Sequence, residues 1–275
     1  MFDLHNHCLP GLDDGARDWE ETLAMARVAV EDGIEGVVCT PHWARGSFEN
    51  NRQGTLAAVA TFKEKLEALA IPLKVYPGAE IRLDFDVSAA IESGEILTVN
   101  DNERFVLIEL LPEILPRNLE NLFWDLQVQR IRPILSHPER NPALLRDPGR
   151  LYKWAEMGIL SQVTAASLLG SFGEEVRKFT VMLLEHRMAH VIATDSHGLG
   201  VRSPRLSPGY EEAARIVGHE TALQMVSETP RRIIEGEPVF APDPLPLEIR
   251  TSKSSFWKRS FSFFRTRRAP HGRRD

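Results

Sequence analysis

The chain has 275 residues, of which 43% are hydrophobic and 26% are charged, so a sizeable core can form and wholesale disorder is excluded. Its formal net charge of -6 combines about -13 on residues 1–250 with about +7 on residues 251–275, and this acidic body argues against nucleic-acid binding. Two cysteines, no signal-peptide pattern and no apolar run of roughly 18 residues exclude a disulfide framework and a membrane span, so we expect a cytoplasmic protein.

Apolar, β-branched runs alternate with segments of helical periodicity along the chain. In chain order, the expected elements are strand Phe2–His5, helix Trp19–Glu31, strand Gly36–Thr40, helix Leu56–Ala70, strand Leu73–Ala79, strand Phe105–Leu110, helix Leu119–Val128, strand Ile131–Ser136, helix Leu144–Met157, strand Ile159–Thr164, helix Val176–His186 and strand His190–Thr194. Strands that alternate with helices predict a parallel sheet, and seven of them fit most economically into a distorted seven-stranded (βα) barrel.

Residues typical of helix ends support these boundaries. Asp18 is expected to cap the helix that begins at Trp19, and Gly33 and Gly158 fall where a helix end favours a left-handed residue. Two further helices, Pro208–Val226 and Pro230–Glu235, are expected to close the barrel.

The chain is expected to divide into a barrel at residues 1–237 and a separate segment at residues 238–275. Prolines at positions 238, 242, 244 and 246 prevent a helix after the barrel. Residues 251–275 then interleave eight Lys and Arg residues with Phe256, Trp257, Phe261, Phe263 and Phe264. This composition is typical of a solvated disordered tail and also of segments that contact anionic membranes, and both interpretations stay open.

Side chains that can bind a metal recur at the ends of the expected strands. They are His5, His7, His42, Glu80, Glu109, His137, Asp195 and His197. Residues delivered from the ends of several strands of a parallel barrel converge at one face. The repetition therefore predicts a multinuclear metal site of a hydrolase.

The strongest local signal is at the N-terminus. His5 and His7 lie two residues apart in an extended strand, so both imidazoles can reach one ion. Asp13 and Asp14 follow in a loop bounded by glycines, where a carboxylate can fold back toward the same ion. Glu109 interrupts the apolar run VLIELL, where a carboxylate is costly unless a cation compensates for it.

Three arginines follow the expected strand ends. Arg140, Arg202 and Arg205 can offer planar guanidinium groups to a phosphoryl group. Any single arginine can equally form an ordinary surface ion pair.

Seven motifs in chain order carry a family resemblance: DLHNHCLPGLDDGA, TPH, GAEI, LIEL, SHPER, QVTAASLLGSFG and TDSHGLGVRSP. Over about residues 1–237 they resemble the polymerase and histidinol phosphatase (PHP) superfamily, and within it the bacterial manganese-dependent protein tyrosine phosphatases of capsule and exopolysaccharide operons. The resemblance implies a TIM-like PHP barrel with three metal ions, most simply Mn²⁺. Iron, zinc and magnesium stay open because His, Asp and Glu accept all of them.

The resemblance also implies roles for individual residues. The metal ligands would be His5, His7, Glu80, Glu109, His137, Asp195 and His197, with Asp14 and His42 helping to hold the third ion. Arg140 and Arg202 would clamp the phosphoryl group and act in catalysis together with Asp14, during attack by a metal-bridging hydroxide. Arg205 would also bind the substrate. The implied substrate is a tyrosine autokinase at the inner membrane that controls polysaccharide export.

Alternatives remain on the same residues. A small-molecule phosphomonoesterase such as histidinol phosphatase would share the metal site, and a non-catalytic polysaccharide-assembly scaffold would share only the fold. Cys39 and Arg45 also satisfy the Cys-x5-Arg spacing of thiol-dependent tyrosine phosphatases, although Pro41 removes a backbone N–H from that loop and no glycines shape it. The amphipathic helices could support a homo-oligomer, but no helix face is marked for one.

Overall fold

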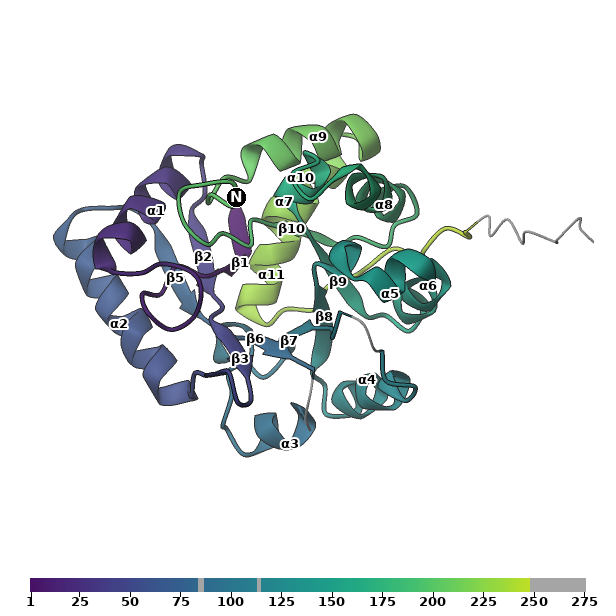
Figure 1. Cartoon of the computed structure of the whole chain (residues 1–275), viewed down its shortest axis with the longest axis horizontal. Coiled ribbons are helices and arrows are strands. Elements are labelled where there is room, and N and C mark those ends of the chain that lie inside the picture. Colours follow the sequence, from purple (N-terminus) through teal and green to yellow (C-terminus); the bar gives the residue numbers. More distant parts are fainter. Residues whose placement is uncertain (84–86, 113–114, 248–275) are drawn as a thin grey trace, which may run out of the picture.

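The computed structural model describes residues 1–83, 87–112 and 115–247, and the predictions for the tail at residues 251–275 lie outside these ranges. Its strands are β1 (Phe2–Asn6), β2 (Gly36–Cys39), β3 (His42–Ala44), β4 (Phe48–Glu49), β5 (Lys74–Pro77), β6 (Glu80–Arg82), β7 (Phe105–Glu109), β8 (Arg132–Ser136), β9 (Leu160–Thr164) and β10 (Val191–Ala193). All seven expected strands are present with ends shifted by at most two residues. In Figure 1 the strands surround helix α11 (Thr229–Glu235), and other helices lie outside them.

Two strands of the barrel are bent, which the sequence did not predict. Sheet β1-β2-β5 and sheet β10-β9-β8-β7-β6-β3-β4 are parallel except for the short antiparallel pair β3 and β4. Residues 40–41 separate β2 from β3, and residues 78–79 separate β5 from β6, so each pair continues one barrel strand across a bend. Pro41 and Gly78 favour these bends because neither sustains a regular strand. The expected distorted seven-stranded barrel is confirmed.

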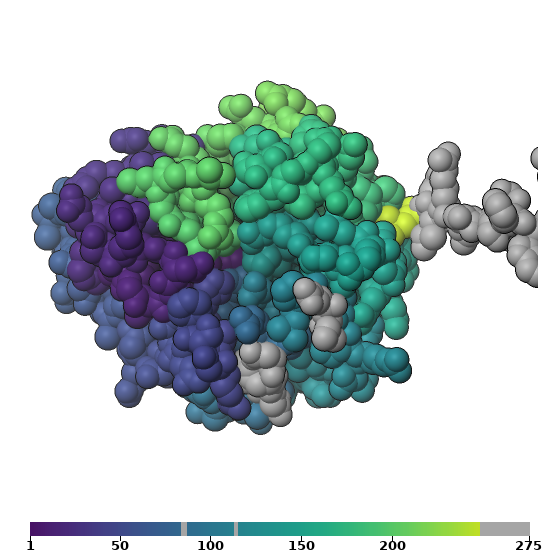
Figure 2. Space-filling model, in the orientation of Figure 1, coloured from purple at the N-terminus to yellow at the C-terminus, as the bar shows by residue number. Residues whose placement is uncertain are grey.

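The barrel closes where β1 meets the residues that follow β10. The backbone N–H of Asp195 donates to the His5 carbonyl at 2.9 Å, and that of His7 donates to the Ser196 carbonyl at 3.0 Å. In Figure 2 the purple N-terminal residues accordingly lie against green residues from the C-terminal half of the chain. This closure joins the DLHNH and TDSH motifs in space.

The helices are α1 (Trp19–Glu31), α2 (Arg52–Ala68), α3 (Val87–Glu92), α4 (Leu119–Val128), α5 (Pro142–Arg146), α6 (Pro148–Glu156), α7 (Ala165–Leu168), α8 (Glu174–Glu185), α9 (Ser207–Val217), α10 (His219–Leu223) and α11, with short turns η1 (Val99–Asp101), η2 (Pro138–Arg140) and η3 (Gln224–Glu228). Asp18 caps α1 by accepting from the N–H of Glu21, as expected. Gly33 and Gly158 have φ of +85° and +82°, also as expected. None of the helices within the described ranges is long and apolar enough to cross a bilayer.

Two of the expected helices are wrong as single elements. The expected helix Leu144–Met157 is split into α5 and α6 because Pro148 lacks the N–H that would continue α5, and Asp147 before it adopts φ -136°. The expected helix Pro208–Val226 is interrupted by Gly218, whose φ is +86°, before α10 and the π-type turn η3.

Strand alternation separates the barrel interior from the layer beneath the helices. On β7, Phe105 and Leu107 belong to an interior cluster that also contains Ile233 of α11, whereas Val106 and Ile108 pack with the helices. With a side-chain period of two, Glu109 at the carboxyl end of β7 falls on the interior side. The strands therefore deliver polar residues to one end of the barrel, while α11 covers the other.

The proline-rich segment after α11 lies at the amino-terminal end of the barrel. Arg132, the first residue of β8, donates to the carbonyl of Val239, and the N–H of Leu245 donates to the carbonyl of His186 at 2.9 Å. The described chain thus ends on the face opposite the carboxyl ends of the strands.

Candidate metal centre

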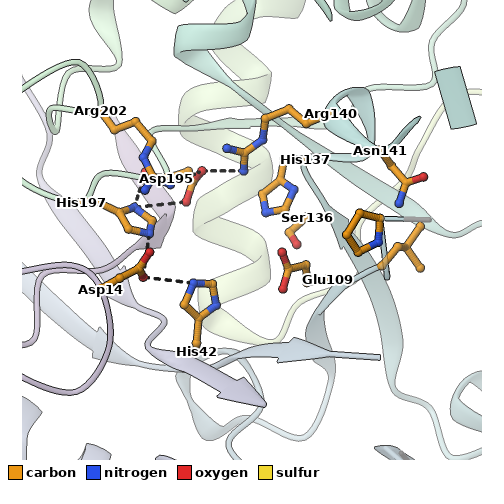
Figure 3. Close-up of a pocket in the computed structure, with 12 residues that line it drawn as sticks. Asp14, His42, Glu109, Ser136, His137, Arg140, Asn141, Asp195, His197 and Arg202 are labelled. Carbon is orange, nitrogen blue, oxygen red and sulfur yellow. Dashed lines mark hydrogen bonds and ion pairs between the residues drawn. The ribbon is translucent and has the colours of Figure 1, made fainter. Parts of the chain in front are cut away.

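A cavity of about 320 Å³ opens at the carboxyl ends of the barrel strands, and most of the predicted site residues line it. Its walls include Asp14, His42, Glu109, His137, Arg140, Asp195, His197 and Arg202 (Figure 3). Below the cavity lie His5, His7 and Glu80, whose side chains are fully buried. All nine predicted metal ligands therefore converge, although they come from seven separate parts of the chain.

The deepest group joins β1 to β6. His5 Nε2 lies 2.9 Å from His7 Nε2 and 3.3 Å from Glu80 Oε2. His7 Nε2 lies 3.6 Å from the same Glu80 oxygen. Asp195 Oδ1 approaches the same two imidazoles at 3.4 and 3.5 Å. His5, His7 and Glu80 therefore form a candidate metal group, and Asp195 offers a further carboxylate oxygen beside it.

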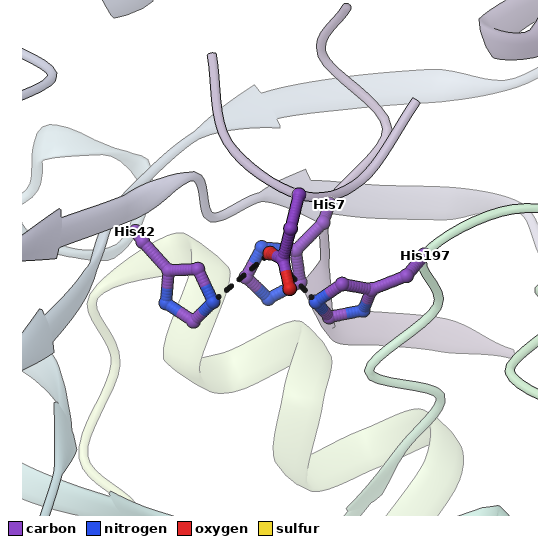
Figure 4. Close-up of side chains that lie close together, drawn as sticks. His7, His42 and His197 are labelled. Carbon is purple, nitrogen blue, oxygen red and sulfur yellow. Dashed lines mark ion pairs between the residues drawn. The ribbon is translucent and has the colours of Figure 1, made fainter. Parts of the chain in front are cut away.

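A second group lies nearer to solvent. Asp14 Oδ1 is 3.4 Å from both His42 Nε2 and His197 Nε2, and the side chain of Asp14 is 56% exposed. In Figure 4 the rings of His7, His42 and His197 converge. These four residues form a separate candidate metal group.

Glu80 links these groups to a third one. Its Oε2 lies 2.9 Å from His42 Nδ1, and its Oε1 lies 2.9 Å from His137 Nε2. Glu109 completes a group with His42 and Glu80. Burial, followed by the charge of Glu80, raises the pKa of Glu109, which a bound cation would offset.

Two buried ligand atoms without a regular hydrogen bond indicate that the residues fit a metal centre. Glu80 Oε2 and His197 Nε2 are buried, and neither makes a hydrogen bond of regular geometry, although His42 Nδ1 lies 2.9 Å from the first and Asp14 Oδ1 lies 3.4 Å from the second. Burial would raise the pKa of Glu80, but the charge of His5 and the contact with His137 hold it well below its usual range. Burial and His7 lower the pKa of His197 to about 4, so its imidazole is neutral. An ionised carboxylate and a neutral imidazole are the forms that bind metal ions.

Three residues outside the predicted ligand set support the ligands; the sequence singled out Asp13 as a carboxylate that could reach the ion, but it gave Gln162 and Ser136 no role. Gln162 on β9 accepts from His5 Nδ1 at 2.8 Å, Asp13 accepts from His7 Nδ1 at 2.7 Å, and Ser136 donates to Glu80 Oε1 at 2.7 Å. Burial would raise the pKa of Asp13, but hydrogen bonding to His7 and backbone N–H groups lowers it to about 2. Such partners fix the orientation of metal ligands. The only sequence signal for Gln162 is its place in the QVTAASLLGSFG motif.

Two of the three candidate arginines reach the cavity. Arg140 Nη2 lies 2.6 Å from Asp195 Oδ2, and Arg202 Nη1 lies 3.5 Å from the same oxygen. Arg205 does not line the cavity, and its guanidinium lies 3.9 Å from Asp32 Oδ1. Arg140 and Arg202 can therefore act on one bound anion, whereas Arg205 is placed beside α1.

Cys39 is not placed for thiol chemistry. It is fully buried at the end of β2, with its Sγ 3.4 Å from Cys8 Sγ. The residues from Cys39 to Arg45 form the end of β2 and strand β3, and no helix begins there. The backbone cradle that a thiolate phosphatase needs is therefore missing from this part of the described chain.

A parallel barrel with clustered imidazoles and carboxylates at its carboxyl end defines a metallohydrolase-type protein. The chain belongs to the family described as "Capsular polysaccharide synthesis, CpsB/CapC", which it matches over residues 1–235. This membership confirms the resemblance inferred from the motifs.

Named relatives agree with the family. The chain is 34% identical to the tyrosine-protein phosphatase YwqE of Bacillus subtilis (strain 168), over 91% of this chain and 98% of that protein. It is 29% identical to the tyrosine-protein phosphatase CpsB of Streptococcus pneumoniae, over 85% of this chain and 98% of that protein. A solved structure from a study of YwqE and CpsB, described as metal-dependent tyrosine phosphatases, superimposes with a TM-score of 0.86 at 33% identity, covering 90% of this chain and 100% of that one.

Proposed function

We propose that this chain is a metal-dependent protein-tyrosine phosphatase, with residues 1–237 as its catalytic unit. The observation that carries the proposal is that nine metal-capable side chains line one cavity or lie directly below it, and that Arg140 and Arg202 line the same cavity. The similarity to YwqE and CpsB supports phosphotyrosine as the substrate group.

The metal ions would be held by His5, His7, Asp14, His42, Glu80, Glu109, His137, Asp195 and His197. Three ions, with Mn²⁺ as the first choice, suit the three groups of side chains. When bound, divalent cations supply an activated water at neutral pH and neutralise charge on phosphoryl oxygens.

The side chains that line the cavity bind and orient the phosphoryl group. Arg140 and Arg202 would each donate hydrogen bonds to its oxygens, and their charge would stabilise the charge that spreads over these oxygens as the ester bond breaks. Asp195 holds both guanidinium groups on the same side of the cavity. Asp14, at the exposed edge, would lie beside the reacting centre. The leaving group is a phenolate with a pKa near 10, so a strong general acid is not required.

We also propose that the protein acts in the cytoplasm on a tyrosine-phosphorylated autokinase at the inner membrane. The basic, aromatic residues 251–275 suit contact with anionic lipid. The described chain ends at the amino-terminal face of the barrel, so a membrane-bound tail would leave the cavity open toward a protein substrate. Cosedimentation with vesicles containing anionic lipid should require residues 251–275, and equal binding of a chain ending at Leu247 would contradict this assignment.

Comparison of three substrates tests the activity. We expect kcat/KM of the Mn²⁺-loaded enzyme to be at least about 100-fold higher for a phosphotyrosine peptide than for the matched phosphoserine peptide, because phenolate is the better leaving group. Histidinol phosphate should also be a poor substrate. A preference for histidinol phosphate would identify a small-molecule phosphatase, and no turnover of any substrate by metal-loaded protein would support a scaffold.

A further inference from the structure

One sequence motif near the cavity has no role in the proposed reaction. The segment QVTAASLLGSFG covers residues 162–173, from β9 through α7 to the start of α8. Gln162 supports His5, but the rest of the segment contacts no predicted metal ligand through a hydrogen bond in the described structure. Instead, it contacts the two residues that end η2, Glu139 and Arg140.

The first contact is between Phe172 and Arg140. The guanidinium carbon of Arg140 lies 4.8 Å from the centre of the Phe172 ring. Arg140 Nη2 donates to Asp195 at 2.6 Å, whereas Arg140 Nε is buried without a hydrogen-bond partner. Among the described residues, the guanidinium therefore contacts one carboxylate at its tip, and its carbon lies over one aromatic ring. A cation near an aromatic face is attracted electrostatically without using its N–H donors.

The second contact fixes the backbone beside Arg140. Glu139 is fully buried, and its Oε1 accepts from the N–H of Thr164 at 2.9 Å and from the hydroxyl of Ser167 at 2.7 Å. Because Glu139 directly precedes Arg140, these bonds tie η2 to the start of α7. Residues 162–173 thus hold both the backbone of η2 and the side chain of Arg140.

The loop that carries Phe172 is itself well defined. Gly170 and Gly173 have φ of +79° and +95°, a conformation that other residues rarely adopt. The N–H of Ser171 donates to the carbonyl of Ala166 at 3.0 Å, and that of Gly173 donates to the carbonyl of Gly170 at 3.0 Å. These turns present the half-buried Phe172 ring toward Arg140.

We propose that Phe172 is a positioning residue for phosphate recognition: its ring orients the Arg140 guanidinium so that free N–H groups face a phosphoryl group in the cavity. The proposal rests on the assigned role of Arg140 in the proposed function. Phe172 acts through Arg140 and does not itself need to touch the substrate. Glu139, through its bonds to Thr164 and Ser167, holds the backbone of η2 beside Arg140.

Binding of inorganic phosphate to the Mn²⁺-loaded full chain tests this directly, because it does not depend on turnover. Phe172→Leu removes the ring but keeps an apolar side chain, and it should weaken phosphate binding about three- to tenfold, the range that a cation–π contact of about 0.7–1.4 kcal/mol implies. Phe172→Tyr keeps the ring and should bind within about twofold of the original chain. Leu169→Ala, an exposed change in the same loop, is the matched control.

A double-mutant cycle with Arg140→Ala separates positioning from general damage. Phosphate should still bind the Arg140→Ala protein through the ions and Arg202, and adding Phe172→Leu should then have no further effect. Equal weakening with and without Arg140, or no weakening by Phe172→Leu alone, would overturn the proposal. Metal content and thermal unfolding, measured for every variant, should match the original chain.

Failure of the Phe172 proposal can be distinguished from failure of the proposed function. If the original chain binds phosphate but does not hydrolyse a phosphotyrosine peptide, the substrate assignment fails while the cycle still reports on Phe172. If it hydrolyses the peptide, Phe172→Leu should raise KM more than it lowers kcat, because part of the arginine contact is made in the bound substrate.

Discussion

The Nδ1–H of His5 donates a hydrogen bond to Gln162 Oε1 at 2.8 Å, from β1 across the barrel to β9. Both side chains are fully buried. Because an amide oxygen can only accept, this contact places a proton on Nδ1, so Nε2, which faces Glu80 and Asp195, is the ring nitrogen that remains for a metal ion. A neutral residue thus sets the tautomer of a predicted metal ligand.

Gln162→Leu should lower metal affinity about 10- to 100-fold, because His5 loses the acceptor that fixes its ring. Gln162→Glu retains an acceptor at the same position and should preserve most of the affinity. Titration of metal-stripped protein with Mn²⁺ measures both. Equal affinity of the Leu variant and the original chain would show that Gln162 does not orient His5.

Asp14→Asn should reduce the number of bound ions from three to two. Asp14 lies at the exposed edge of the cavity, 3.4 Å from the Nε2 atoms of both His42 and His197, whereas Glu80 and Asp195 remain for the deeper ions. Elemental analysis after dialysis against limiting Mn²⁺ gives the count. Asp125→Asn, an exposed acid on α4, is the charge-matched control, and an unchanged count in Asp14→Asn would remove Asp14 from the ligand set.

Gly15→Ala should disrupt the site through its backbone. A Cβ at position 15 would lie 2.0 Å from the His7 carbonyl oxygen and 2.6 Å from His7 Cβ, so His7 must move. We expect a loss of about 1–3 kcal/mol in stability together with weaker metal binding. Gly200→Ala, where a Cβ meets no atom within 4 Å, is the control, to be compared by chemical denaturation and Mn²⁺ titration. Unchanged stability and Mn²⁺ affinity in Gly15→Ala would contradict the close approach of residue 15 to the His7 backbone.

His190 should contribute to acid destabilisation. Burial, and then the charge of Arg132, lower its pKa to about 4, so below pH 6.5 the unfolded chain takes up a proton that the folded chain does not bind. Stability should therefore fall as the pH drops from about 6.5 to 4, by up to about 3 kcal/mol from this residue.

The matched variant is His190→Asn, which keeps an acceptor for the N–H of Ser161 but does not titrate. In urea unfolding at several pH values, the free energy of unfolding of His190→Asn should decrease less between pH 6.5 and 4 than that of the original chain. His219→Asn, at an exposed histidine, should follow the original chain. If the free energy of unfolding depended on pH in the same way for the original chain and His190→Asn, His190 would not contribute to acid destabilisation.

The strands and the metal ligands could be predicted because both depend on local pattern. Short apolar, β-branched runs mark the strands, and His or acidic residues at their ends must converge once the strands are parallel. The bends at Pro41 and Gly78 and the break at Pro148 carried local signals that the simpler strand and helix patterns concealed.

Other features depend on contacts between distant parts of the chain. Gln162 and Phe172 are neutral residues whose roles appear only beside His5 and Arg140. Arg202 and Arg205 lie in the same loop with similar local sequence, but of the two only Arg202 lines the cavity, while Arg205 approaches Asp32 at the C-terminal end of α1. Local sequence could not separate these two arginines.

Hydrolysis of a phosphotyrosine peptide by metal-stripped protein, before and after addition of Mn²⁺, is the most direct test of the metal-centre mechanism. The original chain and Cys39→Ser should both be inactive when stripped and active with Mn²⁺, whereas His42→Ala should remain at least about tenfold less active. Activity that resists chelation and disappears in Cys39→Ser would contradict the metal centre and support a thiolate mechanism instead.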